Sequence, residues 1–217
     1  MKKYEIAVFD VDGTLLDTTE GVLAAVRYTI KENNLPELTE QQLKTFIGPP
    51  IQDSFEKYYH FDNKKLQNLA DCFRNRYKDI DLLKARPYDG IYETFEKLKA
   101  VGIKLAIATY KRQDYARRLL DHFGFNQYTS TIYGADNFNR LKKKDIIIKC
   151  MNDLDVFDYS KAVMIGDSDN DAIGAQAIGM NFLGVTYGFG FVNEEEIFKY
   201  PAIGCANKAS EIAKYFI

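Results

Sequence analysis

The chain has 217 residues, enough for one substantial domain or for a core domain with a smaller insert. Hydrophobic residues make up 46% and charged residues 28%, as in a soluble globular protein, and the net charge of -2 argues against nucleic-acid binding. No stretch approaches the length that spans a membrane. The three cysteines are widely spaced and exclude a disulfide framework or a zinc site. We therefore expect a cytoplasmic protein with neither a nucleic-acid nor a membrane partner.

Short apolar runs alternate with helical patterns along most of the chain. The runs predict strands at residues 6–9, 104–108, 162–165 and 181–185, with a weaker candidate at 131–133. Apolar residues recur at helical spacing in residues 91–100, 113–123, 145–154 and 170–178. Strands that alternate with helices in this way are typical of a doubly wound parallel sheet, so the predicted fold class is α/β.

Residues 18–84 break this alternation, because they show helical spacing and no convincing strand. We expect an α/β core made of residues 1–17 and 85–217, with an all-helical insert at residues 18–84. Within the insert, the turn Ile47-Gly48-Pro49-Pro50 interrupts two helices. We interpret it as a substrate-facing loop, and the alternative is a plain turn between helices.

Polar side chains directly follow three of the predicted strands. Asp10 and Asp12 follow the first, Thr109 follows the second, and Asp167 and Asp171 follow the strand at 162–165. Because ligands bind beyond the carboxyl ends of parallel strands, these side chains are candidates for one common site.

This set of residues suits phosphoryl transfer. Carboxylates without histidine or cysteine favour a hard cation, and Mg2+ is the usual one. A carboxylate can also attack phosphorus as a nucleophile, and Lys143, near the start of a predicted helix, can reach the same edge. Each acidic segment alone is also compatible with a turn or a helix cap, so the joint pattern carries the interpretation.

The chain resembles the haloacid-dehalogenase superfamily, in the branch of the phosphoglycolate phosphatases. The first motif is matched by residues 9–17 (FDVDGTLLD), the second by Ile107-Ala108-Thr109, and the fourth by residues 166–171 (GDSDND). The resemblance covers essentially the whole chain. It implies a Rossmann-like core with an inserted helical cap.

Catalytic roles follow from this resemblance. Asp10 is expected to be the nucleophile that forms an aspartyl-phosphate, and Asp12 the general acid/base. Thr109 is expected to bind the transferring phosphoryl group. Lys143 is expected to neutralise charge, although the third motif is loosely matched, and Lys142 or Lys144 are alternatives.

The resemblance also implies a Mg2+ site. Asp167 and Asp10 are expected to hold the ion together with the main-chain carbonyl of Asp12. Asp171 is expected to be a further ligand or to support one. Tyr110 departs from the family pattern, because many relatives carry a smaller polar residue there.

The implied substrate is a small phosphorylated metabolite. Phosphoglycolate is the leading candidate, and a 5'-nucleotide, pyrophosphate or a sugar phosphate remain open, as does phosphomutase activity. A metal-free haloacid dehalogenase would lack Asp12 and the acidic segment at Asp167. A receiver-type signalling module is about half as long and carries its phosphorylated aspartate on a later strand. We expect a monomer or a homodimer.

Overall fold

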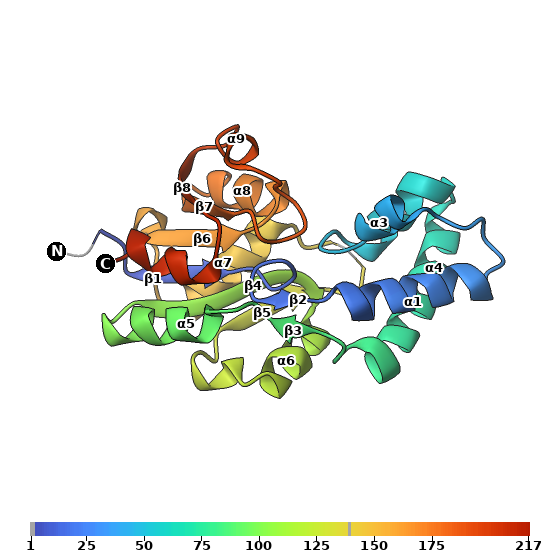
Figure 1. Ribbon diagram of the computed structural model, residues 1–217, viewed down its shortest axis with the longest axis horizontal. Helices are drawn as coiled ribbons and strands as arrows, with labels where there is room; N and C mark the ends of the chain where they lie inside the picture. The colour runs from blue at the N-terminus through green and yellow to red at the C-terminus, as the bar shows by residue number, and fades with distance from the viewer. Residues whose placement is uncertain (1–2, 139) are drawn as a thin grey trace.

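The computed structural model describes residues 3–138 and 140–217. Its centre is a six-stranded sheet in the order β5-β4-β1-β6-β7-β8, in which every neighbouring pair is parallel (Figure 1). The strands are β1 (Ile6–Phe9), β4 (Lys104–Arg112), β5 (Ile132–Ala135), β6 (Ala162–Gly166), β7 (Asn181–Val185) and β8 (Ala202–Ala206). The predicted α/β fold class is confirmed, and β8 is a strand that the sequence did not predict.

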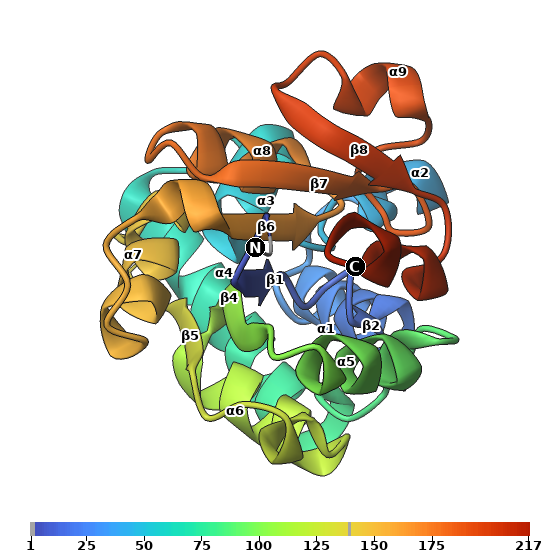
Figure 2. The same ribbon diagram turned by 90° about the vertical axis from the view of Figure 1, so that its left-hand side faces the viewer.

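Helices cover both faces of this sheet. Figure 2 shows α7 and α8 on one side and α5 on the other. The core helices are α5 (Ile91–Ala100), α6 (Gln113–His122), α7 (Lys143–Asp153), α8 (Asp169–Gln176) and α9 (Glu194–Ile197), with short 3-10 helices η2 (Phe125–Gln127), η3 (Tyr159–Lys161) and η4 (Ala209–Tyr215). All four helical patterns predicted between the strands correspond to helices.

The sheet is buried on both faces, which explains why its strands are apolar without alternation. In β1, Ala7 and Phe9 point into the cluster that includes α5 and α6, whereas Ile6 and Val8 point into the cluster that includes α7 and α8. All four side chains are fully buried. Burial on both faces fixes β1 at the centre and therefore fixes the position of the residue that follows it.

The segment between residues 18 and 84 is helical, as expected. Its elements are α1 (Thr19–Glu32), α2 (Glu40–Lys44), α3 (Ile51–Tyr59), α4 (Asn63–Arg76) and the π-helix η1 (Tyr77–Asp81). Figure 1 shows these helices grouped at one end of the sheet. A two-stranded antiparallel sheet, β2 (Leu16–Asp17) with β3 (Arg86–Pro87), links this segment to the sheet at both of its ends.

The described residues contain no helix that is both long and apolar enough to cross a membrane. The thiols of Cys72, Cys150 and Cys205 are all free.

Candidate active site

The loop after β1 turns sharply beside the acidic segment that follows β6. The backbone N–H of Asp10 donates to the carbonyl of Ile165 at 2.9 Å, which keeps the end of β1 in the sheet. Gly13 adopts a positive φ of 82°, and a Cβ there would lie 2.6 Å from Cγ of Asp167. Glycine is therefore needed at residue 13 both for the backbone conformation and for the close approach of the Asp167 carboxylate.

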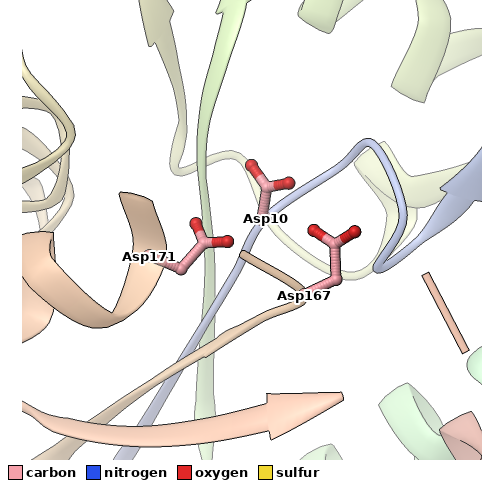
Figure 3. Close-up of side chains that lie close together, drawn as sticks. All are labelled: Asp10, Asp167 and Asp171. Atoms are coloured by element: carbon pink, nitrogen blue, oxygen red, sulfur yellow. The ribbon is translucent and has the colours of Figure 1, made fainter. Parts of the chain in front are cut away.

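Three carboxylates from separate segments meet at this edge of the sheet. Asp10 follows β1, Asp167 follows β6, and Asp171 lies in the first turn of α8. One oxygen from each lies within 4.8 Å of the others, and all three residues are buried (Figure 3). The structure thus brings together three of the acidic residues that the sequence singled out.

Hydrogen bonds from nearby residues hold two of these carboxylates in place. Oδ2 of Asp167 accepts hydrogen bonds from the N–H groups of Phe189 at 2.6 Å and Gly190 at 3.1 Å. Oδ2 of Asp171 accepts the hydroxyl of Ser168 at 2.7 Å and its N–H at 3.2 Å, closing a capping box at the start of α8. In each case, one carboxylate oxygen is held by hydrogen bonds from the protein.

Lys143 is the lysine that reaches this cluster. Its Nζ lies 2.6 Å from Oδ1 of Asp10 and 2.6 Å from Oδ1 of Asp171, whereas Lys142 and Lys144 are exposed. The backbone N–H of Lys143 donates to the hydroxyl of Tyr110 at 2.9 Å. The stem of Lys143 packs against α8 at Gly174, where a Cβ would lie 2.8 Å from Cγ of the lysine.

The cluster places three buried carboxyl groups beside one lysine, so their ionised forms repel one another. Burial raises the pKa of Asp10 to about 7, although Lys143 acts in the opposite direction. Burial also holds the pKa of Asp167 well above its usual range, and the neighbouring carboxylates Asp171 and Asp10 add to the increase. Burial by itself lowers the pKa of Lys143, but Asp10 and Asp171 more than reverse this and raise it. Lys143 thus pairs with two of the three buried carboxyl groups and leaves Asp167 without a cationic partner within the part of the chain that the structure describes.

This donor set fits a hard divalent cation. Among the described residues, Oδ1 of Asp171 is buried and accepts no hydrogen bond of good geometry, although Nζ of Lys143 lies 2.6 Å away. A cation bound by oxygen atoms of Asp10, Asp167 and Asp171 would neutralise the remaining charge. The carboxylate of Asp12 is not in this trio, and a contribution from its main-chain carbonyl stays a prediction.

Asp12 belongs to a second group of contacts, which the sequence analysis missed. Its Oδ1 lies 3.0 Å from Nζ of Lys111 and accepts a short hydrogen bond from the hydroxyl of Thr18. Lys111 also donates to the hydroxyl of Tyr77 at 2.9 Å, and its side chain is only 6% exposed. One signal was available: Lys111 stands two residues after Thr109, so an extended chain places both on the same side.

Thr109 lies within β4 and not beyond its end, contrary to the prediction. The pairing of β4 with β5 is irregular between Ala108 and Arg112, so the strand continues through a bulge. The hydroxyl oxygen of Thr109, which is buried, accepts the N–H of Lys111 at 3.1 Å. The strand therefore continues past the apolar run into the more polar residues 109–112.

A cavity between the helical segment and the core contains Asp12 and Lys111. The loop Ile47-Gly48-Pro49-Pro50 contributes Gly48, Pro49 and Pro50 to its wall. The other residues that line it are Val22, Phe46, Ile51, Gln52, Phe73, Arg74, Tyr77, Tyr110, Arg112, Tyr115, Ala135 and Asp136. The wall is therefore a mixture of aromatic, aliphatic, cationic and acidic side chains.

Comparisons with known proteins agree with this architecture. Residues 7–185 match the family of haloacid dehalogenase-like hydrolases. The chain is 32% identical over 209 residues to a 5'-nucleotidase of Pseudomonas aeruginosa, covering 96% of this chain and 94% of that protein. It is 27% identical over 192 residues to a phosphoglycolate phosphatase of Aquifex aeolicus, covering 88% of each. A crystal structure described as a predicted phosphatase from Clostridium acetobutylicum is 33% identical, with a TM-score of 0.90 and 97% of each chain covered.

The fold and the site define an α/β enzyme with carboxylates gathered at the carboxyl ends of its parallel strands. The chain belongs to the haloacid dehalogenase-like hydrolase family, in the branch that includes phosphoglycolate phosphatases. The prediction of a hydrolase of the phosphatase type is confirmed at this level.

Proposed function

We propose that the chain is a Mg2+-dependent phosphatase that hydrolyses a small phosphomonoester through an aspartyl-phosphate on Asp10. The observation that carries this proposal is the convergence of Asp10, Lys143 and two further carboxylates at one edge of the sheet. When bound by Asp10, Asp167 and Asp171, Mg2+ would neutralise charge on the phosphate and on the nucleophile. Lys143 supplies a second positive charge beside Asp10.

The reaction consists of two displacements at phosphorus. In the first, a carboxylate oxygen of Asp10 forms a bond to phosphorus while the bond to the ester oxygen breaks, and Asp12 donates a proton to that oxygen. In the second, Asp12 takes a proton from water as the water oxygen attacks phosphorus, and the bond to Asp10 breaks. The products are an alcohol and inorganic phosphate, and both aspartates return to their starting states.

Thr109 is proposed to donate a hydrogen bond to the transferring phosphoryl group. Because its oxygen accepts the N–H of Lys111, its own proton is available for donation. Residues 18–84 are proposed to act as a cap that covers a core of residues 1–17 and 85–217 and excludes water from the cavity. The three free cysteines support the proposal of a cytoplasmic location.

Phosphoglycolate is the leading candidate substrate, supported by the resemblance to the Aquifex aeolicus protein. A 5'-nucleotide is the second candidate, because the Pseudomonas aeruginosa 5'-nucleotidase aligns over nearly the whole chain at higher identity.

The proposal is tested by a phosphate-release screen over a panel of phosphorylated metabolites, in Mg2+ and in EDTA. Asp10→Asn should lower turnover by about 10⁴-fold while the protein stays folded, since the amide cannot act as the nucleophile. Asp169→Asn is the matched control, because Asp169 lies in the same acidic segment but is exposed. Turnover of Asp10→Asn near that of the control would refute the covalent mechanism.

Two further readouts separate the parts of the proposal. EDTA should abolish activity and added Mg2+ should restore it, so full activity in chelator would remove the metal requirement. A rearranged phosphorylated product without release of inorganic phosphate would identify a phosphomutase instead.

A further inference from the structure

Arg74 is a buried cation in the wall of the cavity that contains Asp12. It lies in the last turn of α4, and its side chain is 9% exposed. It lines the same cavity as Asp12 and Lys111. A buried guanidinium is unfavourable unless partners meet its charge and its five N–H donors. The partners of Arg74 therefore indicate what the cavity can hold.

The protein meets only part of this requirement. Within the described chain, Nη1 of Arg74 donates to Oδ1 of Asp71 at 3.5 Å and Nη2 donates to Oε1 of Gln52 at 3.2 Å. Both distances are long for such bonds, and Asp71 is half exposed, so this ion pair contributes little. Burial lowers the pKa of Arg74, and although Asp71 opposes this change, Arg112 adds to it. Arg74 keeps unmatched charge and unused donors.

The neighbouring Arg112 has the partners that Arg74 lacks. Its Nε and Nη2 donate to the two carboxylate oxygens of Asp114 at 2.6 and 2.5 Å. Its Nη1 donates to Asn137 at 3.2 Å, and its guanidinium lies 3.9 Å from the centre of the Tyr115 ring. Arg112 is bound to the protein itself, which leaves Arg74 as the under-paired arginine of the cavity wall.

Arg74 lies about one helical turn before Tyr77, which contacts Lys111 beside Asp12. Tyr77 follows it by three residues, a rise of about 5 Å along the helix. The hydroxyl of Tyr77 accepts a hydrogen bond from Lys111, which contacts Asp12. Asp12, Lys111, Tyr77 and Arg74 all line one cavity, so a molecule bound there with its ester oxygen at Asp12 has Arg74 in the same wall.

From these contacts we infer that Arg74 is a specificity-determining residue that binds a second negatively charged group of the substrate, a carboxylate or a phosphate. The inference rests on the proposed function and gives it a substrate class, namely small phosphomonoesters with a second anionic group. Such a group would form charge-assisted hydrogen bonds with the guanidinium. A nucleoside monophosphate has an uncharged far end and leaves Arg74 unpaired.

The test uses three phosphate esters on one two-carbon scaffold: 2-phosphoglycolate, ethane-1,2-diol bisphosphate and the neutral-ended 2-hydroxyethyl phosphate. We expect wild-type kcat/KM for at least one anionic substrate to exceed that for 2-hydroxyethyl phosphate by about tenfold or more. Arg74→Gln should lower kcat/KM for that substrate by about a hundredfold and change the value for 2-hydroxyethyl phosphate by less than about threefold. The better of the two anionic substrates identifies the second group as carboxylate or phosphate.

Two further variants serve as controls for Arg74→Gln. Arg27→Gln removes an exposed arginine of the same helical segment, paired with Glu40, and should leave all three values unchanged. Arg74→Lys keeps the charge but loses the planar fork, so its preference for the anionic substrate should be intermediate. The ratio of kcat/KM between two substrates in one sample does not depend on the folded fraction, so a loss of stability cannot imitate the expected result.

The outcomes separate this inference from the function on which it rests. If Arg74→Gln lowers kcat/KM equally for anionic and neutral substrates, or if the wild-type protein shows no preference between them, the role of Arg74 is wrong and the phosphatase proposal stands. If the wild-type protein releases phosphate from no ester in Mg2+, the proposed function fails and this inference fails with it.

Discussion

The two sides of the site differ in the origin of their residues. On the proposed metal side, Asp10, Asp167, Asp171 and Lys143 all come from the sheet edge, α7 and α8. On the side of Asp12, the contacts come from both parts of the chain, because Tyr77 belongs to the helical segment. The proposed metal side can therefore form without the helical segment, whereas the side of Asp12, the proposed acid/base, has all of these contacts only when the helical segment is in place.

If residues 18–84 act as the proposed cap, we expect this difference to couple the chemistry to closure of the cap. Lys111 lies between Asp12 and Tyr77, so the hydroxyl of Tyr77 is part of the environment of the proposed acid/base. A cap that moves away would remove this contact but leave Asp10 and Lys143 paired. Variants of the two sides should thus have different effects on Mg2+ affinity and on turnover.

Among the variants that compare the two sides, Gly13→Ala on the proposed metal side is expected to have the largest effect. The added methyl group would overlap with the carboxylate of Asp167, so we expect kcat/KM to fall by about 10²- to 10³-fold and the Mg2+ concentration for half-maximal activity to rise. Gly179→Ala is the control, because Gly179 also has a positive φ (71°) but nothing within 4 Å of the added Cβ. Both variants carry similar backbone strain, so equal losses would show that the contact with Asp167 is unimportant.

A smaller effect is expected on the acid/base side. Lys111→Met removes the cation beside Asp12 and should lower kcat by about a hundredfold, with Mg2+ affinity changed by less than about twofold. Tyr77→Phe keeps the ring and removes only the hydrogen bond to Lys111, so a loss of about five- to tenfold is expected. Steady-state kinetics over a Mg2+ titration measure both quantities.

Tyr59→Phe is the matched control for Tyr77→Phe. Tyr59 lies in the same helical segment, and its hydroxyl donates to the carbonyl of Pro36 at 2.8 Å, but it does not line the cavity. Its turnover should equal that of the wild type. A large change in Mg2+ affinity in Lys111→Met would contradict the separation of the two sides.

The sequence predicted the central strands well because burial on both faces leaves a continuous apolar run. It did not predict β8 (Ala202–Ala206), because this short strand consists mostly of alanine, glycine and cysteine and lacks a run of β-branched residues. The pair β2 and β3 was also missed, because each strand has only two residues and the register depends on segments about seventy residues apart in the chain.

The site residues that directly follow a buried strand could be predicted from the sequence. Asp10 and Asp167 directly follow buried strands, so their meeting point follows from parallel topology. The sequence favoured Lys143 but left Lys142 and Lys144 open, because the choice depends on which side of α7 faces α8. The contact between Lys111 and Tyr77 joins residues 34 positions apart in different parts of the fold, and no local pattern encodes it.

The smallest effect is expected at the link between the two regions. Asp17 and Arg86 are direct partners in the β2–β3 pair, with Nη2 of the arginine 2.8 Å from Oδ2 of the aspartate. Burial acts to raise the pKa of Asp17, but hydrogen bonds from Thr19 and Arg86 outweigh it and lower the pKa. Because the folded pKa lies below the unfolded one, the stabilisation is present above the unfolded value and is lost as pH falls through the folded value.

Asp17→Asn should therefore lower the free energy of unfolding at pH 7 by less than about 1 kcal/mol, since Arg86 is largely exposed and water screens the pair. At pH 3 the difference between variant and wild type should shrink, because the wild-type carboxylate becomes protonated there. Denaturant titrations at the two pH values measure this change, with Glu5→Gln as the control for an exposed ion pair within the core. An equal difference at both pH values would mean that packing, and not charge, holds this link together.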